Sequence, residues 1–369
     1  MTSDSFTTTC SLHAASLEAW VTAVNIHGAC CLLGAVPVAL VVWYCRGNRR
    51  WRRGVSLVLG TAIAAIVLCG TLVLRSSSTV LWMGPFLAST MAFGTFFKCC
   101  NCAGIGDVPD GAEASLTNWL LWFLLVPEPI FLKGKLQVAS RSIIQARLWA
   151  MVGKMWGLSA VVSVLVTAPR LQPEFPTFTS ALFLGFLHTW TIYMFASLCL
   201  DISALTAFLL GPLLVGHPVR LHDGFRHPLW HSRTFREAWG ARWNDAVQRL
   251  LQRTVYVPLR RTWSRPAAVV ATFAASGLLH EYNFLVHNTT AYRPGIPLLF
   301  FTCMGCIVVA EGSSKAWLER QTRWLPTPLL ATLLTLVVAV PVKLYFMRSW
   351  FDAGFLDTLT ELFPTIRCA

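Results

Sequence analysis

The sequence predicts an all-α polytopic integral membrane protein with about eight transmembrane helices. Of its 369 residues, 55% are hydrophobic and 13% are charged, whereas soluble globular chains carry roughly 25% charged residues. The chain nevertheless has a formal net charge of +13. This combination excludes intrinsic disorder, which requires low hydrophobicity, and argues against a soluble nucleic-acid-binding protein, whose basic residues coat a water-exposed surface. We therefore expect the lipid bilayer, and no nucleic acid, among the partners.

Apolar runs of about 20 residues, the length that crosses a bilayer, define the expected elements. The predicted spans are 24–45, 55–74, 79–97, 149–168, 178–199, 267–287, 295–311 and 325–346. Two further apolar stretches, 116–132 and 202–216, contain prolines, which remove a backbone donor and kink helices. We expect these two stretches to be re-entrant or interfacial.

Basic residues gather between the predicted spans. Five arginines and no acid lie in 46–53, and ten arginines, no lysine and three acids lie in 217–265. With eight spans, these loops fall on the same side of the membrane as 133–147 and 311–324, and cytoplasmic loops are rich in Lys and Arg. We therefore place all four loops in the cytoplasm and both chain ends on the opposite side.

Three of the twelve cysteines, Cys99, Cys100 and Cys102, cluster after Lys98, where we expect a loop. Free thiols are the favoured interpretation, and S-palmitoylation and a metal site are the alternatives. A metal site would need further ligands at tetrahedral spacing, so no metal is expected. We also expect no disulfide framework of the kind found in secreted proteins.

A polar stripe runs along the predicted span 267–287. At intervals of three or four residues, which keep side chains on one helix face, the span carries Thr272, Ser276, His280, Asn283 and His287. Lipid cannot satisfy polar groups, so the stripe must face the protein interior or a water-filled cavity. Gly277 thins the helix near His280 and allows a neighbouring helix or a ligand chain to approach closely.

His280 is the member of the stripe that we single out. A neutral imidazole accepts a proton from an alcohol at physiological pH; the alternative is a histidine that only hydrogen-bonds another helix. Glu281 lies about 100° round the helix and is a candidate to pair with an arginine of another segment. The spacing alone does not say what His280 acts on, and a transporter or channel with a polar pathway is the rival hypothesis.

The arginine-rich segment 217–265 contains a predicted amphipathic helix. Thr234 and Glu237 form a capping-box pattern, hydrophobic residues then recur at helical spacing, and Pro258 is expected to end the helix. Such a helix lies in the membrane interface. Three interpretations of its arginines stay open: they hold phosphates of an acidic cofactor such as coenzyme A, they hold anionic lipid headgroups, or they only fix the topology.

Two motifs in this part of the chain resemble those of wax synthases, in the membrane-bound O-acyltransferase (MBOAT) superfamily. The run TFREAWGARWNDAVQRLLQRTVYVPL at 234–259 is similar to a family pattern close to S-L-x-x-F-W-G-R-R-W-N followed by V-Y-x-P, and TFAASGLLHE at 272–281 is similar to F-x-x-S-G-x-x-H-E. Glu311 stands where the family has an acid at the end of its next helix. Ala238 and Ala241 replace a usual aromatic and a usual arginine, which bears on the substrate rather than on the class.

The resemblance implies an acyl-CoA-dependent O-acyltransferase whose catalytic residues are His280 and Asn244. The imidazole would accept the proton of the attacking hydroxyl, and the amide would stabilise charge on the thioester oxygen or orient a reactant. The expected partners are acyl-CoA, as co-substrate, and a long-chain fatty alcohol, giving a wax ester; a sterol, a diacylglycerol or a terpenoid alcohol is the alternative acceptor. No permanently bound cofactor is expected.

The resemblance also implies an organisation for the chain. It divides the sequence into an N-terminal transmembrane region (1–177), a catalytic region (178–346) and a C-terminal tail (347–369), in the endoplasmic reticulum membrane. His188, on another span, is a candidate to line the cavity. Residues expected to bind the substrates or support the catalytic pair are Trp239, Arg242, Trp243, Ser276 and Glu281.

Overall fold

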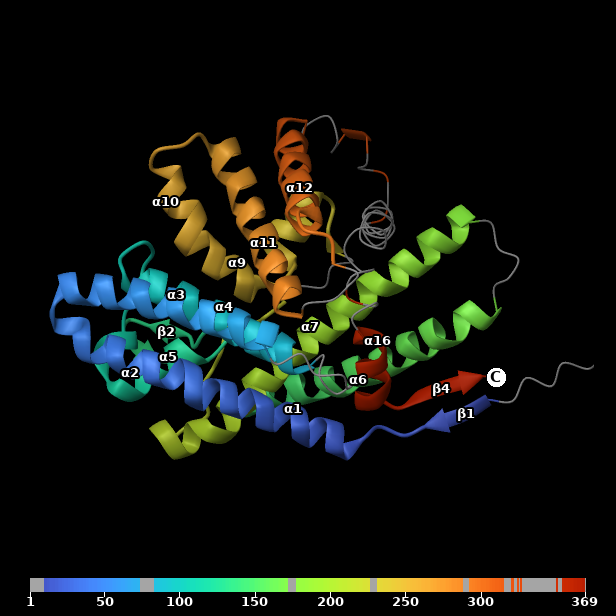
Figure 1. Ribbon diagram of the computed structural model, residues 1–369, viewed down its shortest axis with the longest axis horizontal. Helices are drawn as coiled ribbons and strands as arrows, with labels where there is room; N and C mark the ends of the chain where they lie inside the picture. Colours follow the sequence, from blue (N-terminus) through green and yellow to red (C-terminus); the bar gives the residue numbers. More distant parts are fainter. Residues whose placement is uncertain are drawn as a thin grey trace, which may run out of the picture.

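Long apolar helices make up most of the computed structural model of the chain (Figure 1). The structure describes residues 10–73, 83–171, 177–225, 231–287, 292–314, 320–321, 324, 326, 350 and 354–368. Its longer helices are α1 (Leu17–Cys30), α2 (Val36–Tyr44), α3 (Arg49–Val73), α4 (Met83–Cys102), α5 (Leu116–Leu124), α6 (Arg141–Leu171), α7 (Thr177–Val215), α11 (Arg265–His287), α12 (Ile296–Ser313) and α16 (Phe355–Leu362). A π-helical turn, Cys31–Ala35, joins α1 to α2.

Six helical segments among the described residues are long and apolar enough to cross a membrane. They are Leu17–Gly47, Arg49–Cys69, Arg141–Thr167, Phe183–Val215, Arg265–His287 and Ile296–Ser313, and each overlaps one predicted span. The predicted span 79–97 falls largely in α4, which is not among the six, and 325–346 lies outside the described residues. The prediction of an all-α polytopic membrane protein is confirmed.

The two proline-interrupted stretches behave differently from each other. In 116–132, α5 ends after nine residues, too few to cross a bilayer, and the chain passes into a hairpin of β2 (Phe131–Leu132) and β3 (Lys135–Leu136). The prediction for 202–216 is wrong, because α7 runs without a break for 39 residues and contains Pro212. Pro212 stands in the last turn and removes one hydrogen bond there, and the helix ends within three residues of it.

One large core joins helices from both halves of the sequence. Leu158 of α6, Phe195 of α7 and Phe284 of α11 are buried together with Phe301 of α12 and Phe355 of α16. In Figure 1, α6 and α7 lie beside each other, and α11 and α12 form a second pair with α9 next to it. This arrangement packs α11 against α12 and brings His280 of the polar stripe against Phe301 of α12.

The first and last described segments pair with each other. Strand β1 (Cys10–His13) and strand β4 (Thr365–Cys368) are antiparallel, with Cys10 opposite Cys368 (Figure 1). Cys10 is disulfide-bonded. Paired strands cannot lie on opposite sides of a bilayer, so the pairing agrees with the prediction that both chain ends lie on one side.

Candidate active site

The segment before α11 begins with a capped helical turn. Helix α8 (Phe235–Glu237) starts after Thr234, whose Oγ1 accepts a hydrogen bond of 2.9 Å from the Glu237 N–H. The Glu237 carboxylate accepts in return from the Arg233 N–H at 2.9 Å. The predicted cap at Thr234 is confirmed, although the reciprocal bond goes to Arg233 rather than to Thr234 itself.

The expected continuous amphipathic helix is wrong, because the chain breaks at Asn244. A π-helical turn (Ala238–Arg242) follows α8, and a new helix, α9 (Asp245–Leu251), starts after Asn244. Asn244 has a φ of 40°, in the left-handed region, and its Oδ1 caps α9 by accepting from the Val247 N–H at 3.3 Å. Asparagine is among the residues that favour the N-cap and tolerate this backbone region. Within the described part of the chain this is the one hydrogen bond of the side chain, and it leaves the NH2 group as a donor.

Pro258 does not end the helical stretch as expected. A second π-helical turn (Gln252–Tyr256) follows α9, and Pro258 lies in the first turn of α10 (Val257–Arg260). Proline is tolerated in a first turn, where its missing N–H is not needed. A π-turn immediately before it changes the hydrogen-bonding register, so the chain continues as a helix past the proline.

Glu311, near the end of α12, holds the start of this segment. Its Oε1 accepts from the Phe235 N–H at 2.8 Å, and its Oε2 accepts from the Arg236 N–H at 2.7 Å. The first N–H groups of a helix have no partner within the helix and carry a partial positive charge. The carboxylate satisfies two of them and fixes α8 to α12.

His280 makes a hydrogen bond that places a hydrogen on one of its ring nitrogens. Its Nδ1 lies 2.8 Å from the backbone oxygen of Ser276. A carbonyl oxygen only accepts, so Nδ1 carries the hydrogen, and Nε2 of the neutral ring carries the lone pair. Ser276 therefore supports His280 through its backbone. The basic nitrogen of the neutral ring is therefore Nε2, which lies farther from the backbone than Nδ1.

A row of aromatic rings connects His280 with the residue before Asn244. The imidazole stacks on Phe301 of α12, with ring centroids 4.3 Å apart and planes inclined by 20°. Phe301 contacts Trp239 at 6.3 Å, and Trp239 contacts Trp243 at 5.3 Å. The rings thus form a row from His280 through Phe301 and Trp239 to Trp243, and Asn244 follows Trp243 in the chain.

Trp243 also contacts a ring of α7 and a ring of the segment that follows α7. Its ring lies 6.2 Å from that of Tyr193 and 5.8 Å from that of Phe225. His188 is on the same helix as Tyr193, a little over one turn earlier. Its place in the cavity lining stays a prediction.

Arg242 points to an acid of its own segment. Its Nε donates to Glu237 Oε1 at 3.1 Å, and the two side chains form an ion pair. Burial raises the pKa of Glu237, but the Arg233 N–H and the Arg242 guanidinium outweigh burial and hold that pKa below its usual value. In this arrangement Arg242 stiffens the turn that carries Trp239.

Glu281 and Gly277 join α11 to the start of α12. The expected pairing of Glu281 with an arginine is wrong: the buried carboxylate accepts from the hydroxyl of Tyr292 and, at 3.0 Å, from the Leu298 N–H. Burial and the bond to Glu281 raise the pKa of Tyr292. The close approach expected at Gly277 is confirmed, because a Cβ there would lie 2.7 Å from the Leu298 Cα.

Comparison with known proteins gives one matching family. Residues 223–303 match the sequence profile of the Membrane bound O-acyl transferase family. Two Arabidopsis thaliana relatives are similar over part of the chain. The probable long-chain-alcohol O-fatty-acyltransferase 7 is 31% identical over 141 residues, which are 36% of this chain and 39% of that protein. The probable long-chain-alcohol O-fatty-acyltransferase 8 is 28% identical over 200 residues, or 51% of this chain and 54% of that protein.

Over residues 223–303 the chain is similar to the membrane-bound O-acyltransferase (MBOAT) family, and these relatives carry the names of wax synthase-like enzymes. The matched region, 223–303, contains His280, Asn244 and Phe301, and it therefore includes the aromatic row described above. The similar stretches span about half or less of the length of these curated relatives.

The site residues that the sequence analysis missed are mainly aromatic. Phe301 lies in an apolar run of α12 that gives no sign of its contact with His280, and Tyr193 lies in a similar run of α7. Lys98 and Glu128 form a buried ion pair. These two could have been found, because a charge beside an apolar run needs a partner.

The cysteine cluster at the end of α4 is not an exposed modification site. Cys99, Cys100 and Cys102 lie in the last turns of α4, not in the expected loop, and are 1%, 6% and 5% exposed. All three are free thiols. A fatty acyl group on any of them would need space that the surrounding residues occupy. Among the described residues, no group of three or more His, Cys, Asp and Glu could hold a metal ion.

Proposed function

We propose that this protein transfers a fatty acyl group from acyl-CoA to a long-chain fatty alcohol, forming a wax ester. The printed names of its relatives, long-chain-alcohol O-fatty-acyltransferases, support the acceptor. The catalytic region is residues 178–346, with 1–177 as the N-terminal transmembrane region and 347–369 as the tail. The membrane is that of the endoplasmic reticulum.

The observation that carries the proposal is the hydrogen bond between His280 Nδ1 and the Ser276 carbonyl. It supports Nε2 as the ring nitrogen that accepts the proton of the alcohol, as a general base does. The alcohol oxygen then attacks the thioester carbon, and its bond to that carbon replaces the C–S bond. The proton returns from Nε2 to the departing sulfur of coenzyme A, so the base is restored.

Asn244 supplies a donor for the charge that develops during this reaction. When the alcohol attacks, the thioester oxygen becomes an oxyanion, and a fixed N–H donor stabilises it. Capping of α9 through Oδ1 leaves the amide NH2 for this purpose. The left-handed backbone at Asn244 and the ring of Trp243 beside it support a fixed position for the amide.

The two substrates are expected to reach His280 by different routes. The polar stripe lies on a helix apolar enough to cross the membrane, which suits an acceptor dissolved in the bilayer. The arginine-rich segment lies on the side that we assign to the cytoplasm, where acyl-CoA is found. Trp239, Arg242, Trp243, Ser276 and Glu281 support the site, and acyl-CoA is a co-substrate rather than a bound cofactor.

The test is an esterification assay on microsomes that contain the protein. Labelled acyl-CoA is supplied with a fatty alcohol, a sterol, a diacylglycerol or a terpenoid alcohol, and the ester formed is measured. We expect the fatty alcohol to be the best acceptor and His280→Ala to lower the rate at least about 100-fold. The matched control is His287→Ala. His287 lies seven residues after His280 on the same helix, and its Nδ1 makes the equivalent bond to the Asn283 carbonyl at 2.7 Å.

Each arm of the assay has an outcome that contradicts the proposal. Equal rates for wild type and His280→Ala would remove His280 as the base. Preference for a sterol, a diacylglycerol or a terpenoid would correct the acceptor but keep the class. Absence of ester with every alcohol, from a folded protein, would reject acyl transfer and favour the transporter hypothesis.

A further inference from the structure

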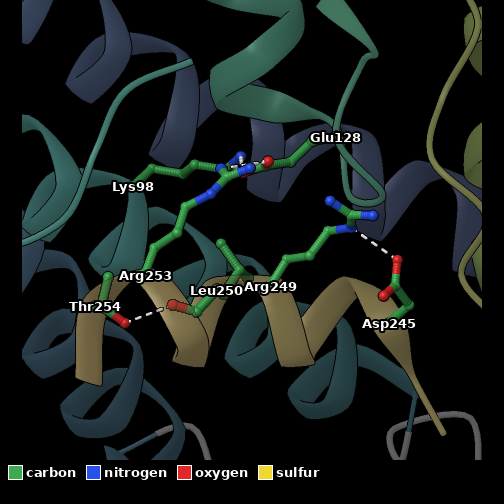
Figure 2. Close-up of polar contacts among 7 residues, drawn as sticks. All are labelled: Lys98, Glu128, Asp245, Arg249, Leu250, Arg253 and Thr254. Atoms are coloured by element: carbon green, nitrogen blue, oxygen red, sulfur yellow. Dashed lines mark hydrogen bonds and ion pairs between the residues drawn. The ribbon is translucent and has the colours of Figure 1, made fainter. Parts of the chain in front are cut away.

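A buried carboxylate between the membrane helices and the arginine-rich segment forms ion pairs with two basic residues. Glu128, in the loop after α5, forms ion pairs with Lys98 of α4 and with Arg253, whose Nη1 lies 2.6 Å from Glu128 Oε2. The Lys98 side chain is 0% exposed and that of Glu128 is 5% exposed. Figure 2 shows the three side chains converging from separate elements. In the same view Arg249 turns away from them, toward Asp245 of its own helix.

We propose that Glu128 is a positioning residue, which holds the helical stretch 245–253 at both ends and thereby orients Asn244. This inference rests on the proposed function, because it assigns Asn244 a fixed role in acyl transfer. Glu128 itself touches neither reactant. It acts through the segment that carries the amide.

The far end of the stretch is held by the carboxylate. Arg253 lies in the π-helical turn that follows α9, and its guanidinium reaches Glu128 across the boundary between the segment and α4. Buried ion pairs are directional, because each charge needs its partner in a narrow range of positions. The bond between Arg253 and Glu128 therefore resists rotation of the stretch about its axis.

The near end is held by the backbone of the segment that follows α7, which is itself hydrogen-bonded to Glu128. The Glu128 carbonyl accepts from the His222 N–H at 2.9 Å. Two residues further along, the Gly224 carbonyl accepts from the Asp245 N–H at 2.7 Å. Asp245 directly follows Asn244. The residue after the proposed donor is therefore connected to Glu128 through residues 222–224.

The environment of Glu128 agrees with a role that depends on its charge. Burial alone would raise the pKa of Glu128, but Lys98 and Arg253 hold it below its usual value. A carboxylate kept ionised in a buried place binds both cations at once. Misplacement of a reacting group by 1 Å can lower rates about 100-fold. The ion pairs of Glu128 with Lys98 and Arg253, which we call the clamp, are therefore expected to affect kcat.

Arg253→Gln is the variant that tests the clamp with least disturbance. It removes the ion pair between Glu128 and the helical stretch 245–253 and leaves Lys98 and Glu128 paired with each other. The Arg253 side chain is 24% exposed and lines a cavity of about 250 Å³ beside Glu128, so water can replace it. We expect a fall in kcat of about 10-fold or more with KM for acyl-CoA within about 2-fold, and partial recovery in Arg253→Lys.

The matched control is Arg260→Gln, which removes an exposed arginine of the same segment. The Arg260 guanidinium donates to the Trp263 carbonyl at 2.8 Å. We expect wild-type kcat from it. A second readout, hydrogen exchange of the amides of 245–253, does not need activity. We expect faster exchange in Arg253→Gln and wild-type exchange in Arg260→Gln.

These readouts separate the clamp from the reaction. Wild-type kcat in Arg253→Gln would overturn the positioning role, whether or not exchange changes. An equal loss in Arg260→Gln would overturn it too, because removal of any positive charge would then have the same effect. If the wild type acylates no alcohol, the proposed function fails, and unchanged exchange in Arg253→Gln would independently reject the clamp.

Discussion

Glu311 accepts a hydrogen bond of 2.8 Å from the backbone N–H of Phe235, 76 positions earlier in the chain. Replacement by alanine leaves the first turn of α8 without its carboxylate, and loss of such a cap costs about 1 kcal/mol. We expect Glu311→Ala to lower the thermal unfolding midpoint in detergent and to reduce esterification, because α8 leads into Trp239.

Glu311→Gln is the companion variant for this prediction. Its amide retains one oxygen that can accept a hydrogen bond but loses the negative charge and the second acceptor. We expect values between those of the wild type and the alanine variant. Wild-type stability in Glu311→Ala would show that α8 does not depend on α12.

Gly277→Ala tests the contact between α11 and α12. The added Cβ would lie 2.7 Å from the Leu298 Cα, which is backbone and cannot swing aside. We expect the two helices to separate and the protein to lose about 1–3 kcal/mol of stability, measured as a lower unfolding midpoint. Gly153→Ala on α6 is the control, since its Cβ would meet nothing within 4 Å and alanine favours the helix.

Phe301→Leu tests the stack on His280. Phe301 and Phe300 are both 6% exposed, so truncation of either leaves a comparable cavity, and Phe301 is the ring that stacks on the imidazole at 4.3 Å. We expect a fall in kcat of about 10-fold or more for Phe301→Leu, against a similar loss of stability but little loss of kcat for Phe300→Leu. Equal kcat values in the two variants would contradict a positioning role for the ring.

The pH dependence of stability follows from Glu128. Its folded pKa lies below the usual value, so its contribution to stability is complete above the unfolded pKa of about 4.3 and is lost as the pH falls below that toward the folded pKa. Glu128→Gln leaves Lys98 buried without its carboxylate, at a cost of about 3–5 kcal/mol near neutral pH. We expect the difference in unfolding midpoint between this variant and the wild type to be large at neutral pH and to narrow below about pH 4.3. A difference that does not change with pH would contradict ionisation of Glu128.

The features predicted from the sequence are those governed by local spacing. Six predicted spans coincide with long apolar helices, because about 20 apolar residues have few alternatives to a helix in lipid. The polar stripe and the cap at Thr234 likewise depend on residues three or four positions apart, and the close approach at Gly277 was predicted from the small size of glycine. The role of His280 came from the resemblance to a family and stays a prediction.

The features that escaped prediction depend on distant contacts. Asn244 breaks the amphipathic helix because its left-handed backbone is supported by Gly224 and by its own cap. Nothing in the hydrophobic period signals that break. Glu281 was expected to meet an arginine, but the neighbouring chain supplies a hydroxyl and an N–H instead. The choice between these partners depends on where α12 begins.

The stack between His280 and Phe301 has a consequence for charge. An imidazole that has accepted a proton is a cation, and the face of an aromatic ring is the electron-rich side of its quadrupole. The centroid distance of 4.3 Å is within the range of about 6 Å over which such a face attracts a cation. Phe301 thus offers the imidazolium an electron-rich face that carries no charge of its own.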